Sequence, residues 1–325
     1  MSTVPSATPF RTSRRRLQDR IGDPAFHLLT LAAALLCIVV VGAIVWKLFD
    51  LAHLSISTFG LHFLTTSVWD PVKNQYGALL FLYGTAVTSF VALLIATPLS
   101  IAIGLYLSEL APRGVRGVIG SLVEMLAAIP SVVLGLWGIL VLGPFMAQHV
   151  DPALQNTLGF LPMFSGPLGQ NGLSMITAIA ILTIMIVPII SSISRELFLS
   201  VPSELEEGAL ALGATRWEMV RGVILPSTRS GVAAAMILGL GRALGEAIAV
   251  TQVIGGATRF QASWFEPADT LASKVAANYQ SASTLLEASS LVYLALILLV
   301  MALVVNVLAQ VIVHRFDPVR VRGAE

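Results

Sequence analysis

The chain has 325 residues, of which 56% are hydrophobic and 11% are charged, against about 45–50% and about 25% in soluble globular domains. Its formal net charge is +1, so its charge gives no reason to expect a nucleic-acid partner. A composition this apolar excludes a single water-soluble core and predicts an integral membrane protein.

Six apolar runs are long enough to cross a bilayer as helices. A span takes about 20 apolar residues, and the first run, residues 26–49, holds a single charge, Lys47, near its far edge. The remaining runs cover residues 77–108, 118–147, 173–194, 229–255 and 288–313. The sequence therefore predicts an all-α membrane protein with six transmembrane helices.

The polar stretches between these runs divide the chain into segments. The expected segments are a cytoplasmic basic tail (1–25), a first transmembrane helix (26–49), an extracytoplasmic segment (50–76), a transmembrane domain (77–314, with a loop at 200–226) and a cytoplasmic tail (315–325). Proline bends or breaks a helix because it lacks an N–H and clashes with the preceding turn. We therefore expect a kink at Pro98 in the second span and a break or kink at Pro130 and Gly135 in the third.

The distribution of Lys and Arg predicts the orientation. Cytoplasmic loops carry an excess of these residues, and six spans place both termini on the same side. With that side in the cytoplasm, fourteen of the nineteen Lys and Arg residues fall inside, four fall outside, and Arg242 lies within the fifth span. We therefore expect both termini and the 200–226 loop to lie in the cytoplasm.

Sequence motifs for metal binding and for ATP hydrolysis are missing. The single cysteine, Cys37, forms no thiolate cluster, and the five histidines are scattered without ligand spacing. A phosphate-binding loop needs a lysine after a glycine, and none of the three lysines follows one. We expect no metal site and no cofactor bound by this chain, and any ATP hydrolysis requires a separate subunit.

The 200–226 loop reads SVPSELEEGALALGATRWEMVRGVILP and carries its own helical pattern. Ser203 can cap a helix whose first turn is rich in glutamate. Gly213 interrupts that helix, and a second helical stretch is expected from about Thr215 to Val223. The pattern predicts a short helical hairpin beside the membrane, which is either an amphipathic connector or a surface that meets a partner.

Two ionisable residues lie inside the fifth span. Arg242 and Glu246 belong to the segment GLGRALGEA and, four residues apart, share one face of a helix. Ionisable groups within a membrane are costly, rare and usually functional. One interpretation is an intrahelical pair that packs two helices together. The other is a site in which the planar guanidinium of Arg242 meets an oxyanion in a transport path.

The loop resembles the EAA loop of ABC importer permeases. The order Glu207-Gly208-Ala209, three residues, Gly213, nine residues and then 223–226 (VILP) is similar to the family pattern Glu-Ala-Ala, three, Gly, nine, Ile, any, Leu-Pro. It departs in having Gly208 for the middle alanine and a valine for the isoleucine. The resemblance implies a coupling helix that docks on a cytoplasmic ATPase. The coupling residues it implies are Glu207, Gly208, Ala209, Gly213, Leu225 and Pro226.

The fifth span is similar to one particular family within these permeases. The segment GLGRALGEAIAV resembles a signature of the permease subunits of the phosphate-specific ABC importer, and it maps a role in phosphate passage onto Arg242 and Glu246. The segments WDPVKNQYGAL (69–79), AIPSVVLGLWG (128–138) and SISRELF (192–198) follow in the family order. The resemblance implies a type I (MetI-like) importer permease fold in the bacterial inner membrane.

The same resemblance implies partners. They are a second permease subunit (PstA-like), an ATPase dimer that holds Mg-ATP (PstB-like) and an extracytoplasmic phosphate-binding protein (PstS-like). The chain itself is then a transporter subunit and not an enzyme. Two alternatives remain: a permease for another oxyanion such as sulfate or molybdate, and an ion-coupled secondary transporter that uses Arg242 and Glu246 as a relay.

Overall fold

The computed structural model describes residues 13–169 and 171–315, with side chains from residue 26 to 313 except those of 113 and 170. The predicted tails therefore lie largely outside the described residues. Contacts divide the chain into unit 1, residues 1–50, and unit 2, residues 51–325. In its described part, unit 1 is the longer portion of helix α1 (Ser13–Phe59), and its side chains include the ion pair Lys47–Asp50 at 2.7 Å.

Regular structure in the described residues is helical. Isolated β-bridges join Asp70 to Gln75 and Gly255 to Ala268. After α1, the first half of the chain forms α2 (His62–Thr65), α3 (Leu79–Leu105), the π-helical turn η1 (Tyr106–Leu110), α4 (Arg113–Ala127), α5 (Ser131–Trp137), the π turn η2 (Gly138–Leu142), α6 (Gly143–Phe145), the π turn η3 (Met146–Val150), α7 (Asp151–Leu158) and the 3₁₀ turn η4 (Pro162–Phe164).

The second half begins with α8, the most buried of the candidate membrane spans among the described residues. The elements are α8 (Met175–Leu199), α9 (Ser203–Ala211), α10 (Arg216–Met219), the π turn η5 (Val220–Ile224), α11 (Leu225–Gly245), α12 (Ile248–Val253), α13 (Leu271–Asn278), the 3₁₀ turn η6 (Tyr279–Ser281) and α14 (Leu285–Arg315).

Six helical stretches in the described residues are long and apolar enough to cross a membrane. They are Phe26–Phe59, Leu79–Leu110, Ser131–Leu158, Met175–Leu199, Arg216–Gly245 and Leu285–Val313. The predicted all-α fold with six transmembrane helices is confirmed.

Three of the predicted spans, the first, the third and the fifth, differ most from the structure, and the fifth covers Arg216–Gly245 instead of 229–255. The third was expected as one run at 118–147, but α4 ends at Ala127 and α5 begins at Ser131, so the span is Ser131–Leu158. Pro130 explains the break, because proline cannot continue the hydrogen-bond ladder and disfavours helix in the residue before it. Helix α1 also continues to Phe59, beyond the predicted end at residue 49.

The core of unit 2 is built around α8. Residues 175–190 of α8 are apolar on every face except for Thr177 and Thr183, which is typical of a helix surrounded by others. Ser174 caps its start by accepting the N–H of Thr177. Buried side chains of α8 pack with those of α3, α5 and α12, and α11 lies along both α8 and α14. This arrangement fixes α11, the helix that carries Arg242, between two others.

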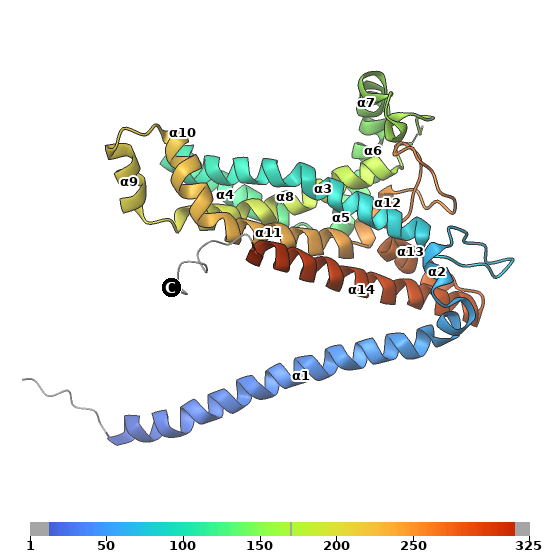
Figure 1. Ribbon diagram of the computed structural model, residues 1–325, viewed down its shortest axis with the longest axis horizontal. Helices are drawn as coiled ribbons and strands as arrows, with labels where there is room; N and C mark the ends of the chain where they lie inside the picture. Colours follow the sequence, from blue (N-terminus) through green and yellow to red (C-terminus); the bar gives the residue numbers. More distant parts are fainter. Residues whose placement is uncertain (1–12, 170, 316–325) are drawn as a thin grey trace, which may run out of the picture. The chain divides into compact units, whose positions relative to one another are not determined.

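Figure 1 shows α3, α8, α11 and α14 running alongside one another within unit 2. The helices α9 and α10 lie at one end of this bundle, and α2 and α13 lie at the other. We call residues 203–219 the α9–α10 hairpin and its end of the bundle the hairpin end. Since α11 starts at the hairpin, its residues near Gly245 lie toward the opposite end.

Candidate functional site

The fifth span breaks beside its ionisable pair. Helix α11 ends at Gly245, Glu246 is extended (φ −74°, ψ 113°), and α12 begins at Ile248. The sequence predicted one helix through residue 255, and that prediction was wrong. The break is stabilised by Glu246 itself, because its Oε1 accepts the N–H of Ala249 in the first turn of α12 at 3.2 Å. A carboxylate is a good partner for such a free N–H.

Because the helix ends between them, Arg242 and Glu246 do not meet on the face of one continuous helix. Arg242 Nη2 lies 3.5 Å from Glu246 Oε2. The Glu246 side chain is only 5% exposed, whereas the Arg242 side chain is 47% exposed. Both carboxylate oxygens therefore have partners inside the protein, while much of the guanidinium is open. The carboxylate acts as a buried counter-ion that holds the arginine from one side.

The open side of Arg242 faces a hollow in the membrane-spanning part. The hollow has a volume of about 570 Å³ and lies between α8, α11 and α14. Apolar side chains such as Ile189 and Ile237 form much of its wall, and Gly241, Asn306 and Gln310 line it together with Arg242. The one cationic group in the wall can donate several hydrogen bonds to an anion, and its planar fork fits two oxygens at once.

The hairpin predicted for residues 200–226 is present. Helix α9 ends at Ala211, and Gly213 has φ +90°, a backbone conformation that glycine adopts without steric strain. Thr215 then caps α10: its Oγ1 accepts the N–H of Glu218, and the Glu218 carboxylate accepts the N–H of Thr215 at 2.8 Å. The two short helices are thus held by a glycine turn and a capping box.

The residues expected to couple to an ATPase divide into two groups. Glu207 and Gly208 are exposed on α9. Ala209 and Leu225 are partly buried against an apolar cluster around Phe198, which attaches the hairpin to the spanning helices. Pro226 lies at the start of α11, directly after the π turn η5, whose wider hydrogen-bond pattern accommodates a residue without an N–H. The structure brings these residues to one end of the bundle, and their role remains a prediction.

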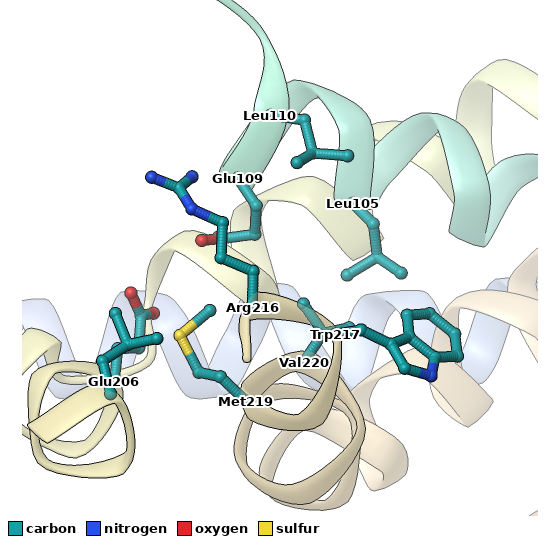
Figure 2. A pocket seen from close by; sticks show the side chains of 9 residues that line it. Leu105, Glu109, Leu110, Glu206, Arg216, Trp217, Met219 and Val220 are labelled. Carbon is teal, nitrogen blue, oxygen red and sulfur yellow. The ribbon is translucent and has the colours of Figure 1, made fainter. Parts of the chain in front are cut away.

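A second hollow, of about 430 Å³, separates the hairpin from the end of α3. Figure 2 shows Glu109, Glu206 and Arg216 around it, with Leu105 and Trp217 on its apolar side. Burial, followed by the nearby carboxylates of Glu109 and Glu207, raises the pKa of Glu206 above its ordinary value. Sequence analysis missed this hollow, because Glu109 belongs to the end of an apolar run far from the loop.

The opposite end of the bundle contains a buried ion pair that the sequence did not predict. Lys274 Nζ in α13 lies 4.0 Å from Asp269 Oδ2, with the two side chains 8% and 6% exposed. The same Nζ lies over the rings of Trp69 and Phe81, at 5.4 and 5.6 Å from their centroids.

Hydrogen bonds complete this pair. The carboxylate of Asp269 accepts the N–H of Thr270 at 2.9 Å and the hydroxyl of Ser273. Burial raises the pKa of Asp269 to about 6, even though these two donors and Lys274 act in the other direction. Burial also lowers the pKa of Lys274. We call Asp269 and Lys274 the α13 pair. Among the described residues, no group of three His, Cys, Asp or Glu side chains could hold a metal ion.

Comparisons with known proteins identify the family of the chain and its fold. Residues 96–321 match the family described as "Binding-protein-dependent transport system inner membrane component". A bacterial ABC transporter involved in the import of the acidic polysaccharide alginate has a similar fold, with a TM-score of 0.62 at 19% identity over 91% of this chain and 99% of that one. A chain of the MetNI methionine ABC transporter gives 0.52 at 19% identity over 72% and 94%. The fold is the type I (MetI-like) importer permease fold.

Curated relatives define the family more narrowly. The phosphate transport system permease protein PstC of Mesorhizobium japonicum is 43% identical over 98% of both chains. The proteins of the same name from Xylella fastidiosa and Haemophilus influenzae are 41% and 40% identical, over 93% and 94% of this chain and 94% and 97% of theirs. The chain belongs to the PstC family. It is a multi-pass inner-membrane permease subunit of an ABC importer and not an enzyme, which excludes the ion-coupled secondary transporter.

Proposed function

We propose that this chain forms part of the path by which inorganic phosphate enters the cell, and that Arg242 receives the anion. The observation that carries the proposal is the half-exposed guanidinium that faces a hollow in the spanning helices, with a buried carboxylate behind it. An anion in a low-dielectric region needs a compensating charge and hydrogen-bond donors. The names of the relatives support phosphate as the cargo.

Glu246 gives this site a resting state. Without cargo, the carboxylate neutralises Arg242 at 3.5 Å, so the cation is not left unpaired in the membrane. An incoming phosphate then competes with Glu246 for the same guanidinium. That competition lowers the net affinity for the anion, which a transport site needs so that the cargo can leave again.

The α9–α10 hairpin is the proposed docking surface for the ATPase. It presents exposed apolar side chains, including Leu205, Leu212 and Trp217, beside the exposed Glu207. In the proposed orientation, the hairpin and both termini lie in the cytoplasm. Mg-ATP binds to the partner ATPase (PstB-like), and this chain holds no cofactor. A second permease (PstA-like) and a phosphate-binding protein (PstS-like) complete the proposed importer.

Helix α11 links the two regions mechanically. Pro226 lies in its first turn and Arg242 near its other end, and the helix is continuous between them. Sixteen residues at about 1.5 Å each separate them by about 24 Å. A displacement of the hairpin by the ATPases therefore reaches Arg242 through a single rigid element, and no chain of loops has to transmit it.

Phosphate uptake at low external phosphate tests the proposal. The cells carry an importer with this chain as their only phosphate importer, and the variant is Arg242→Gln. Arg229→Gln is the matched control, because it removes an exposed arginine from the same helix near the hairpin end. We expect uptake to fall at least tenfold for Arg242→Gln and to stay normal for the control, with the ATPase co-purifying in both.

Normal uptake with Arg242→Gln would refute the role of Arg242. Competition experiments decide the cargo. Unlabelled phosphate should block uptake of labelled phosphate, whereas sulfate and molybdate should not. Uptake of labelled sulfate or molybdate through the same importer, without uptake of phosphate, would show that the cargo is that oxyanion and not phosphate.

A further inference from the structure

Two amide side chains of α14 share the hollow of Arg242. Asn306 and Gln310 lie four residues apart on one helix, so they lie on the same face and about 6 Å apart along the axis. Both line the hollow. Asn306 is opposite Gly241, since a Cβ built on that glycine would lie 4.0 Å from Asn306 Oδ1. Asn306 is therefore at the level of Arg242, and Gln310 is one turn nearer the hairpin end.

These amides are unusual in their helix. Residues 294–313 contain no other polar side chain. Neither amide donates or accepts a hydrogen bond within the described part of the protein; Asn306 is partly buried and Gln310 is exposed. An amide that finds no partner in a membrane costs roughly 1–3 kcal/mol, so two of them on one face of an otherwise apolar helix indicate a partner outside this chain.

We propose that Asn306 and Gln310 form a second, uncharged binding station for the oxyanion, which begins beside Arg242 at Asn306 and extends to Gln310 on the hairpin side. The proposal rests on the proposed function of Arg242. Each amide can donate two hydrogen bonds to phosphate oxygens and can accept one from a P–OH group. The station therefore solvates the anion in place of water without adding a charge.

An uncharged station next to a charged one has a clear physical use. Without the two amides, an anion bound to the Arg242 guanidinium would meet a large energy barrier to leaving, because no other polar group in the wall could replace those hydrogen bonds. Transport through a membrane needs several sites, each strong enough to admit the ion and weak enough to release it. The step of about 6 Å from Asn306 to Gln310 points toward the end at which we propose the cytoplasm lies.

Accessibility of cysteines tests this station directly. Cys37 is the only cysteine in the chain, so Cys37→Ala makes this chain cysteine-free, and Asn306→Cys or Gln310→Cys is then introduced into it within the full importer, with the label read on this chain. Val307→Cys is the matched control, since Val307 is exposed and next in sequence but does not line the hollow. The probe is a negatively charged thiol reagent applied to membrane vesicles, with sodium phosphate or with sodium chloride at equal ionic strength.

We expect phosphate to slow the labelling of the Asn306→Cys and Gln310→Cys variants at least threefold, whereas chloride does not slow it and the Val307→Cys variant shows no difference. Lack of labelling at both test positions would overturn the proposal, because it would place the amides in lipid or in a dry contact with the second permease. Labelling that phosphate does not slow, or slows equally in the Val307→Cys variant, would overturn it as well.

Uptake kinetics separate this proposal from that of Arg242. We expect the double variant Asn306→Leu/Gln310→Leu to lower the ratio of maximal uptake to KM at least fivefold while the ATPase and the second permease still co-purify. In an Arg242→Gln background the same two changes should add little, since the anion no longer enters. Wild-type kinetics for the double variant, with uptake lost in Arg242→Gln, would overturn the station alone. Normal uptake in Arg242→Gln would overturn the proposed function itself.

Discussion

The α13 pair offers a prediction whose size follows from the structure. Lys274→Met removes the cation but keeps much of its apolar volume, and it leaves the carboxylate of Asp269 at 6% exposure without its counter-ion. Breaking a buried pair in this way costs about 3–5 kcal/mol. The lost contact of the ammonium with Trp69 and Phe81 adds about 1–2 kcal/mol.

The double variant Lys274→Met/Asp269→Asn should recover most of this loss. A neutral asparagine can still accept the N–H of Thr270 and the hydroxyl of Ser273, and a buried pair replaced by neutral groups of similar volume is often close to neutral in stability. We expect the double variant within about 1.5 kcal/mol of the wild type. The double variant Lys274→Met/Asp269→Asn should thus be more stable than the single variant Lys274→Met.

The pH dependence gives the sign of the effect independently. The pKa of Asp269 is about 6 in the folded protein against an ordinary value of 3.8. Protonation therefore stabilises the fold, and this contribution is complete below about pH 4 and is lost as the pH rises through 6. Without Lys274 the pKa of Asp269 is higher still. The loss of stability caused by Lys274→Met should therefore be largest at pH 8 and smaller at pH 5.

Heat resistance of the detergent-solubilised importer measures both effects. After heating, the remaining complex is quantified by size-exclusion chromatography at pH 8 and at pH 5. We expect Lys274→Met to lower the apparent midpoint by about 8 °C or more at pH 8, since the loss is at least about 4 kcal/mol and each kcal/mol lowers the midpoint by about 2–4 °C. An equal deficit in the single and double variants, or a deficit that does not change with pH, would refute the reasoning.

Three further substitutions test other parts of the fold. Gly84→Ala places a Cβ on the carbonyl oxygen of Asp269, so we expect a loss of about 1–3 kcal/mol in the same heat assay, and unchanged heat resistance would contradict the close contact. Asp151 is fully buried, and neither of its carboxylate oxygens has a partner in the described part of the protein. Asp151→Asn should therefore raise heat resistance. A lower midpoint would show that the Asp151 carboxylate has a partner outside this chain. Gly213→Ala strains a backbone at φ +90° by about 1 kcal/mol, and we expect it to reduce the amount of ATPase that co-purifies. Gly222→Ala is the control, because a Cβ at Gly222 meets open space, and it should leave that amount unchanged. Equal amounts of ATPase with both variants would show that the turn at Gly213 does not contribute to docking.

Local sequence features predicted the parts of the fold that depend on local physics. The six apolar runs determine six spans because hydrocarbon thickness determines their length. The hairpin could be located because its signals are short-range: a cap at Thr215 and a glycine where the chain needs a positive φ at Gly213. The break at Pro130 was expected from the same kind of rule, although the apolar run at 118–147 assigned the residues on both sides of it to one span.

Features that depend on tertiary packing could not be predicted in this way. The spacing of Arg242 and Glu246 suggested one helix face, but the contact forms across a helix end that Glu246 itself stabilises. Asn306 lies more than sixty residues from Arg242 in sequence, and only the packing of α14 on α11 brings both into one hollow. Lys274 shows no local sign of its partners, because two of them come from the segment around the start of α3.

The helix end at Gly245 has a consequence for torsion. A rotation of α11 about its axis carries Arg242 with it, whereas Glu246 is held by the first turn of α12 and does not belong to the rotating cylinder. With side chains the cylinder has a radius of about 5–6 Å, so a turn of about 30° moves the guanidinium by about 3 Å. That arc is similar to the 3.5 Å that separates the two charges. A rotation of α11 by about 30°, less than the rotation of about 100° between successive residues of a helix, would therefore separate Arg242 from Glu246. The reverse rotation would restore the ion pair.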